Sequence, residues 1–354
     1  MNHSRNAAIA VLSVLAAVAA REASAASSLD AYALSAGGQS ILGAGGGGFS
    51  CATFGPDSRA AAFGGLPQVG LPTDGSVCGV GVDSRAAAGA SGSLTVSSNL
   101  AVGFGPSSDL KTFVGESAGR AEYGNLGVRA SASYTGSTNA FVVTGSQAFG
   151  RQTESMTFAG SGAGFYQPTF TIDGSLFGVG RNYSTLAMLY SAGTGPTFLA
   201  FRILDAYGDL SFYGPGGYVT SFPGFTTTGD LATGFTAAGS TDITLTIPIT
   251  RGVATDITFS LWGSVLPSSN DGLLTASGGD VEFMSTARLT HIDVLDGSGN
   301  ALADFSITSG SGTLYGSNGV ISAAAVPEPE TWALLALGLA ALAGIGSRRS
   351  ARRR

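Results

Sequence analysis

The chain has 354 residues, of which 44% are hydrophobic, only 11% are charged and 55 are glycine. Soluble domains ordinarily carry about 25% charged residues, so the composition excludes a disordered protein of the charge-rich type. Glycine is unfavourable inside helices, which argues against a helical protein. Many short strands joined by glycine-rich turns are the structure that this composition favours.

The formal net charge of −6 is unevenly distributed along the chain. Residues 26–325 contain ten basic and twenty acidic residues, because seven of the seventeen arginines and lysines lie at the two ends of the chain. An acidic body repels nucleic-acid phosphates and anionic lipid headgroups. We therefore expect no nucleic-acid partner.

The first residues are organised like a secretory signal peptide. Arg5 supplies a positive charge, residues 7–20 are apolar, and Ala23-Ser24-Ala25 is a small-x-small cleavage pattern. We expect residues 1–25 to be removed after export through the Sec translocon, which leaves Ala26 as the first residue of the mature chain. A short buried helix is the alternative interpretation.

Cys51 and Cys78 are the two cysteines of the chain. In an exported protein such a pair is usually oxidised, so we expect a disulfide between them. The chain-entropy model gives a bridge across a loop of this length about 3 kcal/mol of stability. Two unpaired buried thiols are the alternative.

One stretch has the pattern of a catalytic motif. Gly115-Glu116-Ser117-Ala118-Gly119 matches the G-x-S-x-G nucleophile elbow, in which the serine lies on a turn between a strand and a helix. The residues that follow have no helical apolar period, and His291 is the one histidine left in the body. A secreted hydrolase that uses Ser117 is therefore the least favoured alternative.

Further along the chain, apolar and polar residues alternate, which is typical of strands with one buried face. The predicted strands are 169–174, 185–192, 197–204 and 209–214. Two hairpins are predicted, one within 241–265 and one that joins 280–296 to 301–309 through a Gly-Ser-Gly-Asn turn. The predicted fold is all-β, an antiparallel β-sandwich with jelly-roll-like connections.

The segment 212–225 combines aromatic residues with glycine and proline. Flat aromatic faces stack on sugars, so Tyr213, Tyr218 and Phe222 are the predicted glycan contacts. Ordinary core and turn packing is the alternative.

The segment 296–300 begins like a calcium loop but lacks the later glycine and glutamate of an EF-hand, so a simple turn is expected. A calcium site formed between loops, with Asp205 and Asp209 among its ligands, is the alternative. We predict no metal site and no cofactor.

Three elements follow one another at the C-terminus. Val326-Pro327-Glu328-Pro329 comes first, and prolines on both sides of Glu328 favour an extended backbone. A short apolar run over 332–345 follows and includes Trp332, Leu334, Leu335, Leu337, Gly338 and Leu339. A basic tail suited to the cytoplasmic side of a membrane ends the chain with Arg348, Arg349, Arg352, Arg353 and Arg354.

This arrangement resembles the PEP-CTERM sorting signal of Gram-negative bacteria, over residues 326–354 alone. The resemblance implies a transient stay in the inner membrane and then cleavage by an exosortase, a membrane protease-transpeptidase. It also implies an association with exopolysaccharide and biofilm, which is common among proteins that carry this signal. We expect the mature protein to lack residues 332–354.

The predicted domains are a signal peptide over 1–25, a glycine-rich all-β extracellular body over 26–325 with a sub-boundary near 93–110, and a sorting signal with one short transmembrane helix over 326–354. The predicted function is a non-catalytic component of the cell surface or extracellular matrix of a Gram-negative bacterium. A secreted carbohydrate-binding or adhesive module is the alternative, ahead of the hydrolase.

Overall fold

The computed structural model describes residues 27–37, 50–53, 76–79, 81–90, 92–104, 111–136, 145–180, 182–192, 196–203, 210–214, 217–219, 224–230, 233–267 and 276–322. The chain divides into two units, Met1–Ala323 and Ala324–Arg354, and every described residue belongs to the first. The predicted signal peptide and sorting signal therefore lie outside the described residues. Within those residues, no helix of the length and apolarity needed to cross a membrane is found.

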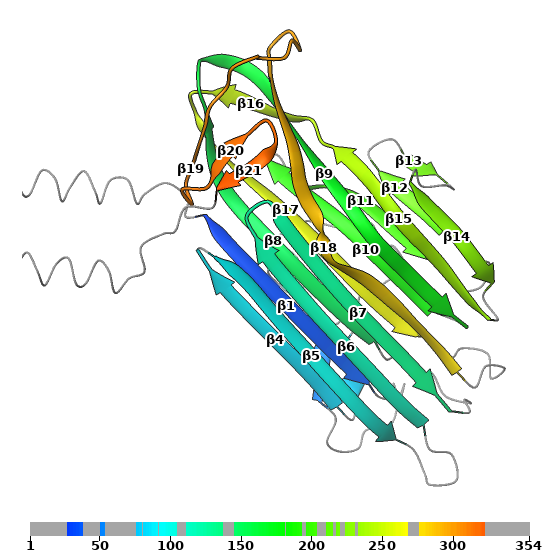
Figure 1. Ribbon diagram of the computed structural model, residues 1–354. Coiled ribbons are helices and arrows are strands. Elements are labelled where there is room, and N and C mark those ends of the chain that lie inside the picture. The colour runs from blue at the N-terminus through cyan, green and yellow to red at the C-terminus, as the bar shows by residue number, and fades with distance from the viewer. Residues whose placement is uncertain are drawn as a thin grey trace, which may run out of the picture. The chain divides into compact units, whose positions relative to one another are not determined.

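The described elements are all β-strands and their pairings are all antiparallel, which confirms the prediction of an all-β antiparallel fold. Nine strands form sheet I (Figure 1). Eight follow one another in space, and the ninth, β19, pairs with β8. In this order the strands are β13 (Gly217–Val219), β12 (Leu210–Gly214), β11 (Pro196–Ile203), β10 (Asn182–Ala192), β17 (Ala254–Pro267), β8 (Gly145–Phe158), β1 (Ser28–Gly37) and β4 (Gly81–Gly89), with β19 (Ile307–Ser309) beside β8.

Eight strands form sheet II, in which β16 pairs with β9 outside the main row. The row is β14 (Phe225–Asp230), β15 (Gly234–Thr244), β9 (Gly162–Val179), β18 (Ala276–Asp296), β7 (Asn125–Thr135), β6 (Lys111–Glu122) and β5 (Ser93–Phe104), with β16 (Ile247–Arg251) beside β9. Two small hairpins complete the described chain: β2 (Ser50–Thr53) with β3 (Ser76–Gly79), and β20 (Leu314–Gly316) with β21 (Gly319–Ser322).

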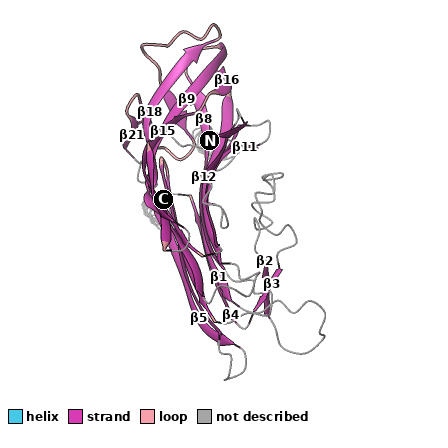
Figure 2. Cartoon of the chain, turned by 90° about the vertical axis from the view of Figure 1, so that its right-hand side faces the viewer, coloured by secondary structure: helices cyan, strands magenta, loops and turns pink. Residues whose placement is uncertain are grey.

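Sheets I and II lie face to face, and Figure 2 shows them as two layers. Strand β4 contacts β5 at one edge, β1 contacts β6, β8 contacts β7, and β17 contacts β18. The core fills the space between the layers. The Phe170 ring of sheet II, for example, lies 4.8 Å from the Phe259 ring of sheet I, and both side chains are fully buried. Burying a ring of this kind contributes about 1.5–3 kcal/mol.

The predicted strands 169–174 and 185–192 fall in β9 and β10. The predicted strands 197–204 and 209–214 coincide with β11 and β12, except for residues 204 and 209, which lie outside the described residues. Their alternation is real: in β9, Tyr166, Phe170 and Ile172 are buried, while Gln167 and Thr169 between them are partly exposed. A strand with a period of two therefore places one face in the core.

The predicted hairpin within 241–265 is wrong. Strand β16 pairs with β9 in sheet II, whereas β17 lies between β8 and β10 in sheet I. The turn between them, which includes Gly252 with a φ of 81°, carries the chain from one sheet to the other. Alternation identified both strands, but it carries no information about which strand each one pairs with.

The hairpin predicted from 280–296 and 301–309 forms only next to its turn. Asp296 Oδ1 accepts the backbone N–H groups of Ser298 (2.8 Å) and Asn300 (2.9 Å), which makes 296–300 a simple turn as expected. Ala301 makes an isolated bridge to Leu295. The chain then leaves sheet II, and β19 pairs with β8 in sheet I.

Candidate functional site

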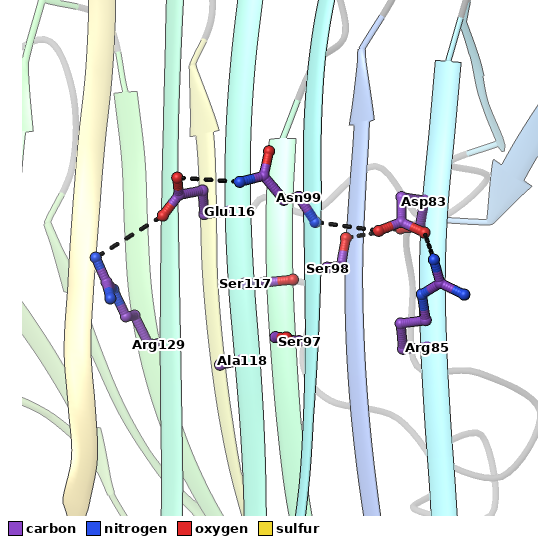
Figure 3. A pocket seen from close by; sticks show the side chains of 9 residues that line it. All are labelled: Asp83, Arg85, Ser97, Ser98, Asn99, Glu116, Ser117, Ala118 and Arg129. Carbon is purple, nitrogen blue, oxygen red and sulfur yellow. Dashed lines mark hydrogen bonds and ion pairs between the residues drawn. The ribbon is translucent and has the colours of Figure 1, made fainter.

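A polar groove of about 480 Å³ lies at the edge of the body where β4 of sheet I meets β5 of sheet II (Figure 3). Strands β4 to β7 supply its lining, which consists of Asp83, Arg85, Ser97, Ser98, Asn99, Glu116, Ser117, Ala118 and Arg129.

Strand alternation decides which side chains point outward into this groove. In β6, Glu116 and Ala118 lie on the outer face, while Ser117 between them is buried. Pairing then brings outward residues together across strands, since Asn99 of β5 stands opposite Glu116 and Arg129 of β7 stands opposite Ala118.

The charged and amide groups of the groove form one continuous chain of contacts (Figure 3). Arg129 Nη2 lies 3.9 Å from Glu116 Oε2, and Asn99 Nδ2 donates to Glu116 Oε1 at 3.2 Å. The backbone N–H of Asn99 donates to Asp83 Oδ2 at 3.1 Å, and Asp83 Oδ1 lies 3.2 Å from Arg85 Nη2. Two carboxylates thus face two guanidinium groups, so the groove is polar without a net formal charge.

The same contacts join the edges of the two sheets. Strand β5 ends the row of sheet II and β4 ends the row of sheet I. Asp83 accepts the outward N–H of Asn99 through its carboxylate, and its own carbonyl accepts the Ser98 hydroxyl at 2.9 Å. An unpaired strand edge is a template for association with other strands, and these bonds occupy part of it.

The outer face of sheet II continues beyond the groove to Asp280 and Glu282 of β18. Arg129 Nε lies 3.1 Å from Glu282 Oε2, and Asp280 stands opposite Ser131, the neighbour of Glu116 in register. Burial, and then the negative charge of Glu282, raises the pKa of Asp280 to about 6. This part of the face therefore changes its charge in mildly acidic solution.

Ser117 lies in the middle of β6, and its hydroxyl donates to the carbonyl of Leu34 at 3.1 Å. Strand β7 follows β6 after a tight turn, so the strand–helix turn of a nucleophile elbow is not present in residues 111–135. His291 lies on β18, with Nε2 3.2 Å from Asp293 Oδ2. Strand β7 separates β6 from β18, so the structure does not pair Ser117 with His291 as nucleophile and base.

The structure places the other predicted site residues only in part. Tyr213 of β12 and Tyr218 of β13 occupy facing positions on neighbouring strands, while Phe222 lies outside the described residues. Cys51 and Cys78 face each other in the β2–β3 pair. Two further groups of predicted residues lie outside the described residues. They are Ala23, Ala25 and Ala26 at the predicted cleavage point, and the sorting-signal residues from Val326 to Arg354.

Neither the groove nor Glu154, a buried carboxylate on β8, is among the sites predicted from the sequence. Asp83, Asn99, Glu116 and Arg129 come from four strands, and nothing local in the sequence joins them. Glu154 did leave a signal, because it occupies the same alternating position as Met156 and Phe158, where an apolar residue is expected.

The groove offers carboxylate, amide, hydroxyl and guanidinium groups side by side. Such a mixture can both donate to and accept from a ligand that carries many hydroxyl groups. Within the described ranges, no three histidine, cysteine, aspartate or glutamate side chains gather as metal ligands.

Comparison with known protein families confirms the predicted sorting signal at the C-terminus. Residues 325–354 match the family model described as the PEP-CTERM protein-sorting motif. No curated protein and no solved structure matches the chain. The chain thus carries a PEP-CTERM protein-sorting motif, which marks an exported protein of a Gram-negative bacterium that depends on an exosortase.

Proposed function

We propose that this protein is a non-catalytic component of the cell surface or extracellular matrix that associates with exopolysaccharide in biofilm. The sorting motif at 325–354 is the observation that carries the proposal, because it directs an exported chain to an exosortase. The body then serves as a sandwich scaffold with jelly-roll-like connections that remains outside the cell after processing.

Processing at both ends is part of this proposal. Signal peptidase removes residues 1–25 after export through the Sec translocon, and the chain remains in the inner membrane through its C-terminal helix until the exosortase removes residues 332–354. The position of the first described strand supports the first step, since β1 begins at Ser28, three residues after Ala25 at the predicted cleavage point.

The polar groove supports an association with glycans. Its hydrogen-bonding groups, among them Asn99, Glu116 and Arg129, lie together on one face. The charges of Glu116 and Asp83 are balanced by those of Arg129 and Arg85, so the lining has no net formal charge. A neutral, polar surface binds hydroxyl-rich chains without the strong salt dependence of a charged one.

A carbohydrate-binding module with a defined aromatic site is the second candidate. The facing positions of Tyr213 and Tyr218 on β12 and β13 favour it, since directly opposed residues of an antiparallel pair are about 4.5–5.5 Å apart. Two aromatic residues at such positions can make a platform for a sugar ring.

Co-sedimentation of the exported protein with exopolysaccharide extracted from its own bacterium tests the proposal. We expect saturable pelleting. Asn99→Ala and Arg129→Ala should weaken it if the groove binds the glycan, whereas Tyr213→Ala with Tyr218→Ala should weaken it if the aromatic site does. Asp256→Asn, a change at an exposed residue of β17, serves as the control.

Protein that stays in the supernatant at every concentration of exopolysaccharide would contradict the proposed association. Recovery of residues 332–354 in protein taken from the cell surface would contradict the proposed processing. An esterase activity abolished by Ser117→Ala would replace the proposal with the hydrolase alternative.

A further inference from the structure

A carboxylate with no exposed surface lies at one end of the body. Glu154 is 0% exposed, and it points inward from β8 between the two sheets. Its Oε1 accepts the Ser27 hydroxyl at 3.0 Å and the Ser311 backbone N–H at 2.9 Å. Its Oε2 accepts the Ser311 hydroxyl at 2.9 Å and the Tyr315 hydroxyl at 3.1 Å.

These four donors come from opposite ends of the body in sequence. Ser27 is two residues beyond the predicted signal-peptide cleavage point, while Ser311 and Tyr315 lie shortly before the sorting motif at 325–354. The three donor residues are almost completely buried. One side chain thus binds both ends of the body.

Neutral groups hold the Glu154 carboxylate. No arginine, lysine or histidine forms an ion pair with it within the part of the chain that the structure describes. Burial, and then the negative charge of Glu154, raises the pKa of Tyr315, so this hydroxyl stays protonated and donates. A buried carboxylate depends on every such bond, because a donor that is lost cannot be replaced by water.

The two ends also contact each other. Strand β19 pairs with β8 as far as Ser309, Gly310 donates its N–H to the carbonyl of Ser155, and Ser311 then bonds to Glu154. A Cβ atom at Gly310 would lie 2.7 Å from Ser27 Oγ. Glycine at this position therefore lets the first residues of the body lie against the last.

We propose that Glu154 is a clasp that couples the two processed ends: docking of Ser27 stabilises docking of the segment 307–322, which leads into the sorting motif. The clasp makes Glu154 a positioning residue for that motif, because 307–322 stays folded and only residues from 323 onward are presented.

Hydrogen exchange of the exported protein tests the coupling directly. Ser27→Ala removes one donor at the N-terminal end, and we expect the amides of residues 309–316 to exchange about tenfold faster, as the loss of a hydrogen bond to a charged group implies. The matched control is Ser35→Ala, because Ser35 is a buried serine of β1, the strand that Ser27 directly precedes. Ser35 accepts from Ser146 on β8 and bonds to no residue of 307–322 in the described structure.

Either of two results would overturn the clasp: unchanged exchange at 309–316 in Ser27→Ala, or an equal acceleration there in Ser35→Ala. Tyr315→Phe gives a second measurement, since it removes one donor from the other end. The effects of Ser27→Ala and Tyr315→Phe on exchange should combine non-additively, whereas additive effects would show that the ends act independently.

The consequence for processing rests on the proposed function, and it has its own readout. Mass spectrometry of the exported chain should find wild-type C-termini only within 323–331, while Glu154→Gln should add cuts within 307–322. Gln152→Leu is the control, because Gln152 is an equally buried side chain two residues away that instead accepts the Gly124 N–H at 2.6 Å. Identical C-termini in all three proteins would refute the positioning role, whatever the exchange measurement shows.

Discussion

Inward-facing glycines bring the two sheets into close approach. A Cβ atom at Gly119 would lie 2.4 Å from the carbonyl oxygen of Phe149 and 2.6 Å from that of Tyr32. At Gly150 it would lie 2.1 Å from the carbonyl oxygen of Arg120. Gly119, the last residue of the G-x-S-x-G pattern around Ser117, therefore admits the backbone of the opposite sheet.

Gly119→Ala should lower the free energy of unfolding by about 1–3 kcal/mol, the usual range for overpacking a core. The obstructing atoms belong to the backbone, so no side-chain rotation relieves the clash. Urea denaturation of the exported protein measures the change. Gly89→Ala is the control, because the added Cβ would lie 3.5 Å from the nearest atom, a Leu94 methyl group, which is an ordinary contact. Equal stability of Gly119→Ala and wild type would mean that the sheets are further apart than described.

The ionisation of the Asp280 carboxyl group makes the free energy of unfolding depend on pH. Its pKa is raised from the ordinary aspartate value of 3.8 to about 6 in the folded protein, chiefly by burial. The folded state therefore holds this proton more tightly than the unfolded state does, and the associated stability is present below about pH 4 and is lost as the pH rises through about 6. Because the carboxyl group is partly exposed, solvent screening reduces the effect to on the order of 1 kcal/mol.

Asp280→Asn should remove this dependence and raise the melting temperature at pH 7 more than at pH 4. Thermal unfolding between pH 4 and pH 8 measures both proteins, with Asp256→Asn, an exposed carboxyl of β17, as the control. A wild-type curve that runs parallel to that of Asp280→Asn over this range would contradict the assignment.

At the scale of strands, the sequence predicted the elements better than their partners. The alternation of Ile243, Leu245, Ile247 and Ile249 with polar residues correctly indicates one buried face. It cannot distinguish a hairpin from a chain that crosses between sheets, since both need an inward apolar row. For that reason β16 and β17 were predicted as one hairpin, although they belong to different sheets.

The candidate sites also divide into those that lie within one local segment and those that are assembled from strands distant in sequence. The proximity of Tyr213 and Tyr218, which are register partners on β12 and β13, could be expected because they lie close together in one aromatic segment, while their contact with a glycan stays a prediction. The groove could not, because its residues are brought together by the pairing of β5 with β6 and of β6 with β7. Binding of Ser27 and Ser311 by Glu154 depends on residues more than 120 positions from it in sequence, a separation at which local patterns carry no information.

The small β2–β3 hairpin should be closed by a disulfide. Cys51 and Cys78 face each other across an antiparallel pair, and the Cα atoms of such pairs are about 4.5–5.5 Å apart, within the range of a disulfide. We expect the exported protein to resist alkylation at both cysteines until it is reduced, and reduction to cost about 3 kcal/mol of stability. Alkylation of both cysteines in unreduced protein would contradict the bridge.

At the scale of the whole described body, the strands that complete the sheets come late in the chain. Strand β17 lies between β8 and β10 in sheet I, and β18 lies between β7 and β9 in sheet II. Each therefore joins an earlier part of its sheet, formed from residues before 160, to a later part. Contacts of this kind have a large sequence separation, which is typical of slowly folding β-proteins.

This strand order bears on how the protein crosses the membrane. When a chain is translocated with its N-terminus first, β7, β8, β9 and β10 emerge long before β17 and β18. One edge each of β8 and β10 stays unpaired until residue 267 has passed, and one edge each of β7 and β9 until residue 296 has passed. Unpaired edges invite association with other chains. Any factor that shields these edges therefore has to act before the C-terminal part of the same polypeptide has crossed the membrane.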